Sequence, residues 1–336
     1  MSQGWKDAFA ESAAYADALG LELAIAGSPG WSETGGPWVT PEDGMKKMAY
    51  SLTYVDGGKP FNGVLNHPPT TTGAYQTSTS GTGHQSGGAG KPQFYRDQKV
   101  LAFQIADDAI LPTPVVSSSG GTVNAIALSD GFYDTPAVNL KAAEREGGIS
   151  WVRFDYGKPV TVNGVVLAIR SQGPMLFRLE ASDDGVNWSD TGASILSSSV
   201  VRTSSVDNVT ARYFRFVSVK QPPAPPSGWR RWGGATPPPP EEIQIAELVL
   251  LGTPTVHSFE AKAAFWGGNP YFQLPSGSMG TDAVISASEV LDLTDQLQDD
   301  GPLRWTPPSG TWAILRIGYS LTGAQNRPAA PEATGL

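Results

Sequence analysis

Between Pro114 and Leu251 the sequence repeats one pattern, in which short apolar stretches of strand length alternate with turns. One such turn is Asp183-Asp184-Gly185. Short strands at this spacing are typical of an antiparallel β-sandwich, because each strand needs neighbours to cover its apolar face. We therefore predict a sandwich built from Trp151–Tyr156, Val160–Ile169, Phe177–Ser182, Val200–Thr203, Ala211–Val219 and Ile243–Leu251.

Two apolar stretches outside this region, Leu21–Ala26 and Trp312–Tyr319, are predicted to be strands that are buried on both faces. Strands of this kind occur in parallel α/β barrels. Because two strands cannot close a barrel, we expect the natural protein to begin before Met1 and to continue beyond Leu336. The sandwich would then be an insertion into the barrel.

Helix signals flank the first of these stretches. Apolar residues recur at helical spacing over Trp5–Leu19, and Gly20 follows as the predicted C-cap. Thr40, followed by Pro41, is typical of a helix N-terminus and predicts a second helix that reaches about Tyr50.

The predicted fold class is therefore an α+β multidomain chain, in which part of a (β/α)8 barrel is interrupted by an antiparallel jelly-roll β-sandwich. Residues 1–55 are predicted to be the first helix–strand–helix segment, and 56–113 a linking β segment with a flexible Gly/Ser/Thr tract. Residues 114–252 are the sandwich, and 253–336 return to the barrel and end at a barrel strand and its loop.

Composition excludes several classes of partner. The net charge is −9 and Lys and Arg form no cluster, which argues against binding to nucleic acid or to anionic membranes. No apolar run approaches the roughly 20 residues that span a bilayer, so no membrane insertion is expected. The absence of cysteine excludes disulfides and thiolate metal sites.

A turn rich in aromatic residues and glycines follows the first predicted strand. It contains Trp31, Glu33 and Trp38. In parallel α/β folds the loops at the carboxyl ends of strands build the active site, and tryptophan faces beside polar groups are surfaces on which sugar rings stack. A rigid turn whose tryptophans only pack at a hinge is the alternative. The Trp312–Tyr319 strand is likewise followed by a polar loop with Thr322 and Asn326.

The sandwich region resembles the discoidin-like (F5/8 type C) galactose-binding jelly roll. The resemblance extends over roughly 130 residues and implies the fold more strongly than it implies sugar binding. It is carried by Ser129-Asp130-Gly131, Trp151-Val152-Arg153-Phe154-Asp155, Glu180-Ala181-Ser182-Asp183-Asp184-Gly185-Val186-Asn187-Trp188, Ala211-Arg212-Tyr213-Phe214-Arg215 and Ile245-Ala246-Glu247-Leu248.

Ordered motifs outside the sandwich resemble glycoside hydrolase family 106, the α-L-rhamnosidases. The resemblance implies a large, secreted or periplasmic bacterial enzyme with a (β/α)8 catalytic barrel, which depends on calcium and hydrolyses terminal α-L-rhamnose with inversion. The motifs are Leu19-Gly20-Leu21-Glu22-Leu23, Pro29-Gly30-Trp31-Ser32, Gly35-Gly36-Pro37-Trp38, Phe94-Tyr95-Arg96-Asp97, Leu101-Ala102-Phe103, Val290-Leu291-Asp292-Leu293-Thr294, Trp312–Tyr319, Thr322-Gly323, Asn326, Pro328-Ala329 and Thr334-Gly335-Leu336.

Inverting hydrolysis needs two carboxyl groups, and the resemblance implies that they lie on later barrel strands. We therefore assign no catalytic residue and no calcium ligand to this chain. The candidate substrate-binding residues are Trp31 and Trp38 as stacking platforms, Thr322 and Asn326 as hydrogen-bonding partners of sugar hydroxyls, and Glu33. Glu33 either orients ligand or lies near calcium, or is solvated or contacts a helix N-terminus. Arg316 is predicted to be a strand or barrel-core charge with a partner.

Two functions of different classes follow. The first is a fragment of an α-L-rhamnosidase that acts on a rhamnose-containing oligosaccharide or polysaccharide and is inactive by itself. The alternative is a non-catalytic carbohydrate-binding protein that acts through the jelly roll. A parent enzyme that acts on another deoxy-sugar is a third possibility.

Overall fold

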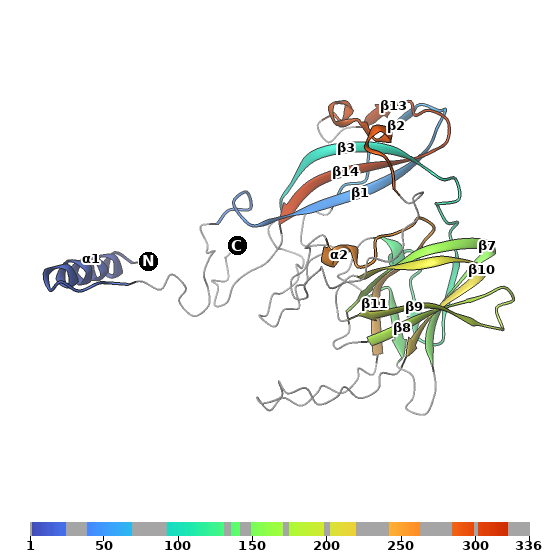
Figure 1. Cartoon of the computed structure of the whole chain (residues 1–336), viewed down its shortest axis with the longest axis horizontal. Helices are drawn as coiled ribbons and strands as arrows, with labels where there is room; N and C mark the ends of the chain where they lie inside the picture. The colour runs from blue at the N-terminus through green and yellow to red at the C-terminus, as the bar shows by residue number, and fades with distance from the viewer. Residues whose placement is uncertain are drawn as a thin grey trace.

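The computed structural model describes residues 2–24, 39–68, 93–130, 136–141, 149–170, 175–197, 202–219, 242–262, 284–298 and 302–321 (Figure 1). The helices are α1 (Gln3–Ala18) and α2 (Phe259–Lys262), with short 3-10 segments at Ala127–Ser129, Ala287–Glu289 and Thr294–Gln296. The strands are β1 (Lys46–Asp56), β2 (Phe61–Gly63), β3 (Tyr95–Ile105), β4 (Val115–Ser118), β5 (Thr122–Val123), β6 (Val138–Lys141), β7 (Ser150–Ile169), β8 (Met175–Ser182), β9 (Ser189–Ser197), β10 (Arg202–Val219), β11 (Glu242–Leu251), β12 (Leu291–Asp292), β13 (Leu303–Trp305) and β14 (Thr311–Leu321).

The larger sheet has the order β5-β6-β11-β7-β10-β8-β9, and β4 also pairs with β7. Its pairings are antiparallel, which confirms the predicted strand direction in this region. The sequence indicates two strands on either side of Gly157, but both belong to β7, because β10 pairs along both halves of it. The likeness to the discoidin fold stays a prediction.

The sheet folds over a core of aromatic and aliphatic side chains that alternate with outward-facing residues. Phe177 and Phe216 stack with ring centroids 4.7 Å apart, and Phe214 meets Tyr156 edge to face at 6.2 Å. Phe177, Phe214 and Phe216 have no exposed surface. This burial is the main source of stability for the region.

A separate four-stranded sheet has the order β1-β14-β3-β12. β14 runs antiparallel to β1 on one side and to β3 on the other, so the prediction of a parallel barrel strand over Trp312–Tyr319 is wrong. Its apolar character has another cause. One face of β14 is buried, where Trp312 and Ile314 belong to one core with Val100, whereas Leu315, Ile317 and Tyr319 on the other face are only partly buried.

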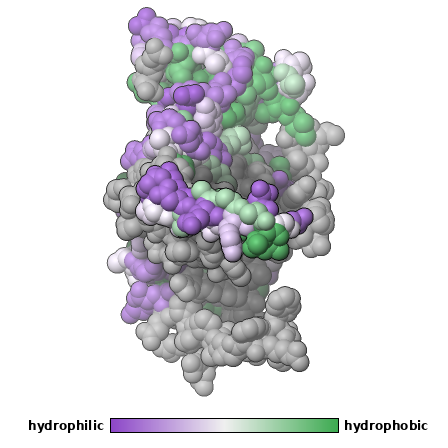
Figure 2. Space-filling model, turned by 90° about the vertical axis from the view of Figure 1, so that its left-hand side faces the viewer, coloured by the Kyte–Doolittle hydropathy of each residue, from purple (hydrophilic) through white to green (hydrophobic). Residues whose placement is uncertain are grey.

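The N-terminal helix matches its prediction. α1 ends in a Schellman motif, in which Gly20 has φ +66°, its N–H donates to Asp17 O at 3.0 Å, and Leu21 N–H donates to Ala16 O at 2.9 Å. No residue of α1 is buried. Figure 2, viewed from the α1 side, shows hydrophilic and hydrophobic residues together on the described surface.

Two predictions that follow α1 in the sequence are wrong. Residues 21–24 form no strand, and Leu21 and Leu23 are 62% and 48% exposed; the rest of the predicted strand lies outside the described residues. The predicted helix at 40–50 is a turn followed by β1. The Thr40 carbonyl oxygen closes that turn by accepting from the N–H groups of Asp43 and Gly44 at 3.0 Å, and its hydroxyl donates to Asp43 Oδ2 at 2.9 Å. The chain then forms a strand from Lys46 onward because Lys46 pairs with Leu321 of β14.

Parallel βα units of a (β/α)8 barrel are not found among the described residues, which are mostly strands in antiparallel pairings. The described helices include none long and apolar enough to cross a membrane. The predicted domain boundaries stay predictions. The larger sheet and the four-stranded sheet nevertheless have hydrophobic cores with no residue in common.

A matched pair of substitutions tests the core of the larger sheet. Val162 is fully buried and Val186 is 77% exposed. Val162→Ala removes two methyl groups, each contributing about 0.8 kcal/mol, and leaves a cavity, so it should lower the free energy of unfolding by about 2 kcal/mol. Val186→Ala should change it by less than about 0.5 kcal/mol. Urea unfolding followed by tryptophan fluorescence measures both, and equal effects would contradict this core.

Candidate functional site

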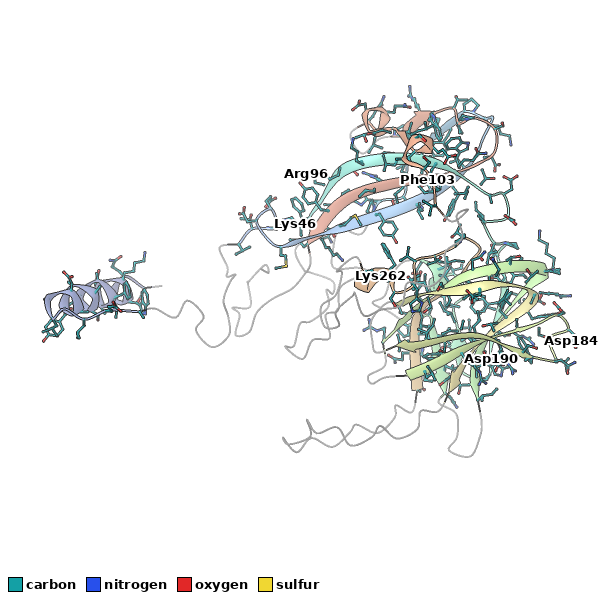
Figure 3. The ribbon with its side chains drawn as sticks, viewed as in Figure 1. Lys46, Arg96, Phe103, Asp184, Asp190 and Lys262 are labelled. Carbon is teal, nitrogen blue, oxygen red and sulfur yellow. The ribbon has the colours of Figure 1, made fainter. Side chains whose placement is uncertain are left out.

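Three strand ends meet at one end of the four-stranded sheet. β1 begins there at Lys46, β3 begins at Tyr95 and β14 ends at Leu321. Lys46 is the cross-strand partner of Leu321, and Tyr95 is the partner of Ser320. Figure 3 shows Lys46 and Arg96 at this same end.

The five predicted substrate-binding residues lie outside the described residues: Trp31, Glu33, Trp38, Thr322 and Asn326. The first three precede β1 in the sequence and the last two follow β14. Their described neighbours in the chain therefore meet, because Lys46 pairs with Leu321. The structure adds residues at this sheet end that were not predicted to bind substrate, and we name the set Lys47, His67, Tyr95, Asp97, Arg316 and Ser320 the strand-end cluster.

An ion pair between a buried arginine and a partly exposed aspartate is at the centre of the strand-end cluster. Arg316 on β14 is 3% exposed, and its Nε and Nη2 donate to Asp97 Oδ1 and Oδ2 at 2.8 and 2.7 Å. This two-point geometry is the strongest form of arginine–carboxylate contact. The prediction that Arg316 is a strand charge with a partner is confirmed.

Tyr95 is hydrogen-bonded to the carboxylate of this ion pair. Its hydroxyl donates to Asp97 Oδ1 at 2.7 Å, and the ring of His67 meets its ring edge to face at 4.6 Å. Burial, reinforced by the hydrogen bond to the Asp97 carboxylate, raises the pKa of Tyr95 well above its ordinary value. Gly318 makes room for this ring, because a Cβ at Gly318 would lie 2.6 Å from the Tyr95 hydroxyl oxygen.

Asp97 remains a carboxylate. Burial by itself would raise its pKa, but the hydrogen bonds from Arg316 and Tyr95 outweigh that effect and hold the pKa below the ordinary value. A carboxyl group in this state does not donate a proton near neutral pH. Asp97 can therefore orient its neighbours, but it cannot serve as the general acid of a glycosidase.

Lys47 and Ser320 form the other side of the cluster as cross-strand partners. Burial lowers the pKa of the Lys47 amine to about 7. Ser320 has no exposed surface, and its Oγ has no hydrogen-bond partner within the described part of the chain. These two residues add polar groups beside the Asp97–Arg316 pair.

Lys46 stabilises the turn that precedes β1. Its Nζ donates to the carbonyl oxygens of Pro41, Glu42 and Gly44 at 2.8, 2.8 and 2.7 Å, and it lies 4.3 Å from the centre of the Phe94 ring. Burial lowers its pKa, although Asp43 and Glu42 act in the opposite direction. The turn that leads into β1 is therefore fixed by one ammonium group.

The strand-end cluster has one carboxylate, whereas inverting hydrolysis needs two, set about 6.5 to 9.5 Å apart. It therefore contains no catalytic pair. Within the described ranges no group of three or more His, Asp or Glu side chains could hold a metal ion, and the expected calcium dependence stays a prediction. The cluster can therefore supply fixed polar groups beside a ligand, but no acid–base pair.

A sequence signal for the pair did exist. Arg316 interrupts an apolar strand, whereas Asp97 lies among the polar residues Arg96 and Gln98; opposite charges on adjacent strands tend to pair. The register that makes them neighbours is not visible in the sequence, because about 220 residues separate them.

Removing the carboxylate of Asp97 tests this arrangement. Asp97→Asn leaves Arg316 buried without a counter-charge and should lower the free energy of unfolding by about 3 to 5 kcal/mol. Lys99→Gln, which breaks the exposed Lys99–Asp292 pair, is the matched control and should have no measurable effect. Urea unfolding at pH 7 measures both.

The contribution of Asp97 to the free energy of unfolding should depend on pH in a defined direction. Because the folded-state pKa of Asp97 is lowered, its stabilisation is complete above the ordinary aspartate pKa of about 3.9 and is lost as the pH falls below it. The difference between wild type and Asp97→Asn should stay constant between about pH 5 and 8 and narrow below about pH 4. If the difference in free energy of unfolding between the two proteins grew as the pH fell, the Asp97–Arg316 ion pair would be contradicted.

Comparisons with known proteins agree on one family. The sequence profile described as alpha-L-rhamnosidase, of glycoside hydrolase family 106, matches residues 1–336. A solved rhamnosidase from Novosphingobium sp. PP1Y is 37% identical with a TM-score of 0.74, over 100% of this chain and 29% of that one. A putative beta-glucuronidase of Formosa agariphila is 37% identical over 103 residues, which are 31% of this chain and 7% of that protein.

The chain thus spans less than a third of the length of either relative. The match to the family profile, in contrast, extends over the whole chain, through the four-stranded sheet and the larger sheet alike. The chain therefore belongs to glycoside hydrolase family 106, the alpha-L-rhamnosidase family.

Proposed function

We propose that this chain is a region of an enzyme that removes terminal α-L-rhamnose from plant or bacterial glycans. The observation that carries the proposal is the family match over residues 1–336, supported by the rhamnosidase structure at 37% identity. Because the chain spans 29% of that rhamnosidase, the activity is proposed for a longer polypeptide that contains this region.

The proposed reaction is hydrolysis with inversion. One carboxylic acid protonates the leaving oxygen while a carboxylate on the opposite face of the sugar activates water. Asp97 cannot be the acid, because Arg316 and Tyr95 hold its pKa down. We place both catalytic carboxyl groups outside residues 1–336, and we propose that this region positions the sugar through Trp31, Glu33, Trp38, Thr322 and Asn326.

The strand-end cluster supports that role. It lies where β1 and β14 pair, next to the two segments that carry these five residues, and its ion pair holds β14 in register with β3. A site is effective only when the groups that hold the substrate are fixed by rigid neighbours. Calcium dependence and a secreted or periplasmic location belong to the proposal and rest on the family resemblance alone.

The reaction is tested with an aryl α-L-rhamnoside, with the matching aryl β-D-glucuronide as the control substrate. The longer polypeptide should release the aryl group from the rhamnoside only, and proton NMR should show β-L-rhamnose as the first product, because inversion converts the α-linkage into the β-anomer. Residues 1–336 by themselves should release none. Turnover by this chain alone would contradict the placement of the acids, and α-L-rhamnose as first product would contradict inversion.

The stacking role is tested by substitution in the longer polypeptide. Trp31→Ala and Trp38→Ala should each raise KM about tenfold, since aromatic stacking contributes about 0.5 to 1.5 kcal/mol beyond burial of area. Trp5→Ala is the matched control, because Trp5 is 52% exposed on α1, and it should leave KM unchanged. Equal effects of the three substitutions would contradict a specific role.

A further inference from the structure

The larger sheet has an outward face lined by arginines and aromatic rings. On β7, Val152 and Phe154 are buried in the core, whereas Trp151, Arg153 and Asp155 alternate with them and point outward. Residues of β8 and β10, with Trp188 just before β9, complete a set that we name the arginine face: Trp151, Arg153, Asp155, Arg178, Glu180, Trp188, Arg212, Tyr213 and Arg215.

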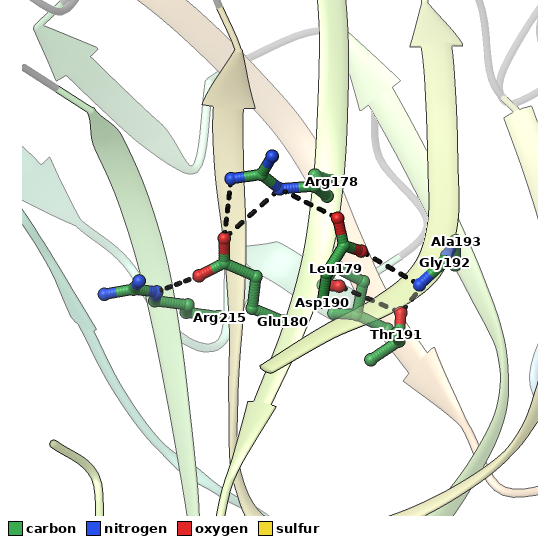
Figure 4. A network of polar contacts seen from close by, with 8 residues as sticks. All are labelled: Arg178, Leu179, Glu180, Asp190, Thr191, Gly192, Ala193 and Arg215. Atoms are coloured by element: carbon green, nitrogen blue, oxygen red, sulfur yellow. Dashed lines mark hydrogen bonds and ion pairs between the residues drawn. The ribbon is translucent and has the colours of Figure 1, made fainter. Parts of the chain in front are cut away.

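Three of the four arginines on this face are neutralised by carboxylates. Glu180 accepts from Arg178 Nη2 at 2.8 Å and from Arg215 Nε at 2.6 Å (Figure 4). Arg212 binds both carboxylate oxygens of Asp155, at 2.9 and 3.1 Å. These arginines have partners within the fold and need no ligand.

Arg153 differs from the other three. Its Nε donates to Ser117 Oγ at 3.3 Å, and no carboxylate of the described residues forms an ion pair with it. It is also the direct cross-strand partner of Arg215. Arg215 is already neutralised by Glu180, and Asp155, whose charge also acts on Arg153, is bound to Arg212. An anion beside Arg153 would therefore add a direct charge partner that the described residues do not supply.

Aromatic rings lie beside the guanidinium groups. Arg153 lies 5.6 Å from the centre of the Trp151 ring, and Arg215 lies 4.4 Å from that of Trp188. The two Nη groups of Arg153 form no hydrogen bond within the described residues. A flat ring beside such an arginine combines a stacking platform with a two-point carboxylate binder. A pyranose ring that carries a carboxylate matches both features, because its ring can stack on the tryptophan and its carboxylate can bind the guanidinium group.

We propose that the arginine face binds a uronate residue of an acidic glycan, with its carboxylate on the Nη groups of Arg153 and its ring against Trp151. The net charge of −9 disfavours longer polyanions such as nucleic acid, which would approach the whole molecule rather than one arginine. The proposal is independent of the rhamnosidase activity, because it concerns binding on another sheet and no bond is cleaved.

Calorimetric titration of the full chain with tetragalacturonate, and with its uncharged methyl ester, tests the proposal. The acid should bind at least tenfold more tightly than the ester, and its affinity should fall as salt is added. Arg153→Gln should weaken binding of the acid by about 10- to 100-fold, as expected for loss of a charged two-point contact, and leave the ester unaffected. Arg153→Lys should restore only part of the affinity, since lysine lacks the planar fork.

Arg304→Gln is the matched control, because Arg304 is exposed on β13 outside this face, and it should bind as wild type does. Thermal unfolding of each variant checks that the fold is intact. Equal binding of acid and ester, wild-type affinity in Arg153→Gln, or no binding of tetragalacturonate to the wild type would each overturn the proposal. Tighter binding of a DNA oligonucleotide than of tetragalacturonate would overturn it as well.

Discussion

The position of β14 between β1 and β3 is the constraint on which the rest of the structure depends. Its pairing with β1 joins residues 46–56 to residues 311–321, and its pairing with β3 adds 95–105. Closing loops of this length costs conformational entropy that grows only slowly with loop length. The strands of the larger sheet lie between β3 and β14 in the sequence, and this long insertion adds little to the entropy cost of pairing β14 with β3.

The buried Arg316 makes this pairing specific. A charge that is 3% exposed needs its partner, and Asp97 meets it only in the observed register of β14 with β3. A shift of one residue would turn Arg316 to the opposite face of the sheet and leave both charges without partners. The ion pair thus selects one register for strands whose apolar residues by themselves would tolerate others.

Arginine has two different roles in this chain. Arg316 pairs with Asp97 and stabilises the fold, whereas Arg153 is partly exposed on a sheet face and forms no ion pair within the described part of the chain. The difference arises from the neighbouring strand. β3 presents Asp97 to Arg316, whereas β10 presents Arg215 to Arg153. The same residue type is therefore structural in one sheet and available to a ligand in the other.

The sequence by itself determined the local elements whose signals lie within a few residues. These include α1 with its Gly20 cap and the strand segments within β7, β8, β10 and β11. It also carried the ordered motifs of the family, whose profile matches the whole chain. Of the site it indicated Arg316 as a paired charge, but Asp97, Tyr95 and Lys47 were not singled out.

Only the tertiary structure decided which strands are neighbours. Leu21 and Trp312–Tyr319 are both apolar, yet Leu21 is exposed and the second stretch is a central antiparallel strand. Residues after Thr40 form a strand rather than a helix because Lys46 pairs with Leu321. Apolar character shows that a segment can be buried, but direction, register and partner depend on residues hundreds of positions away, and these are fixed only when the whole chain has folded.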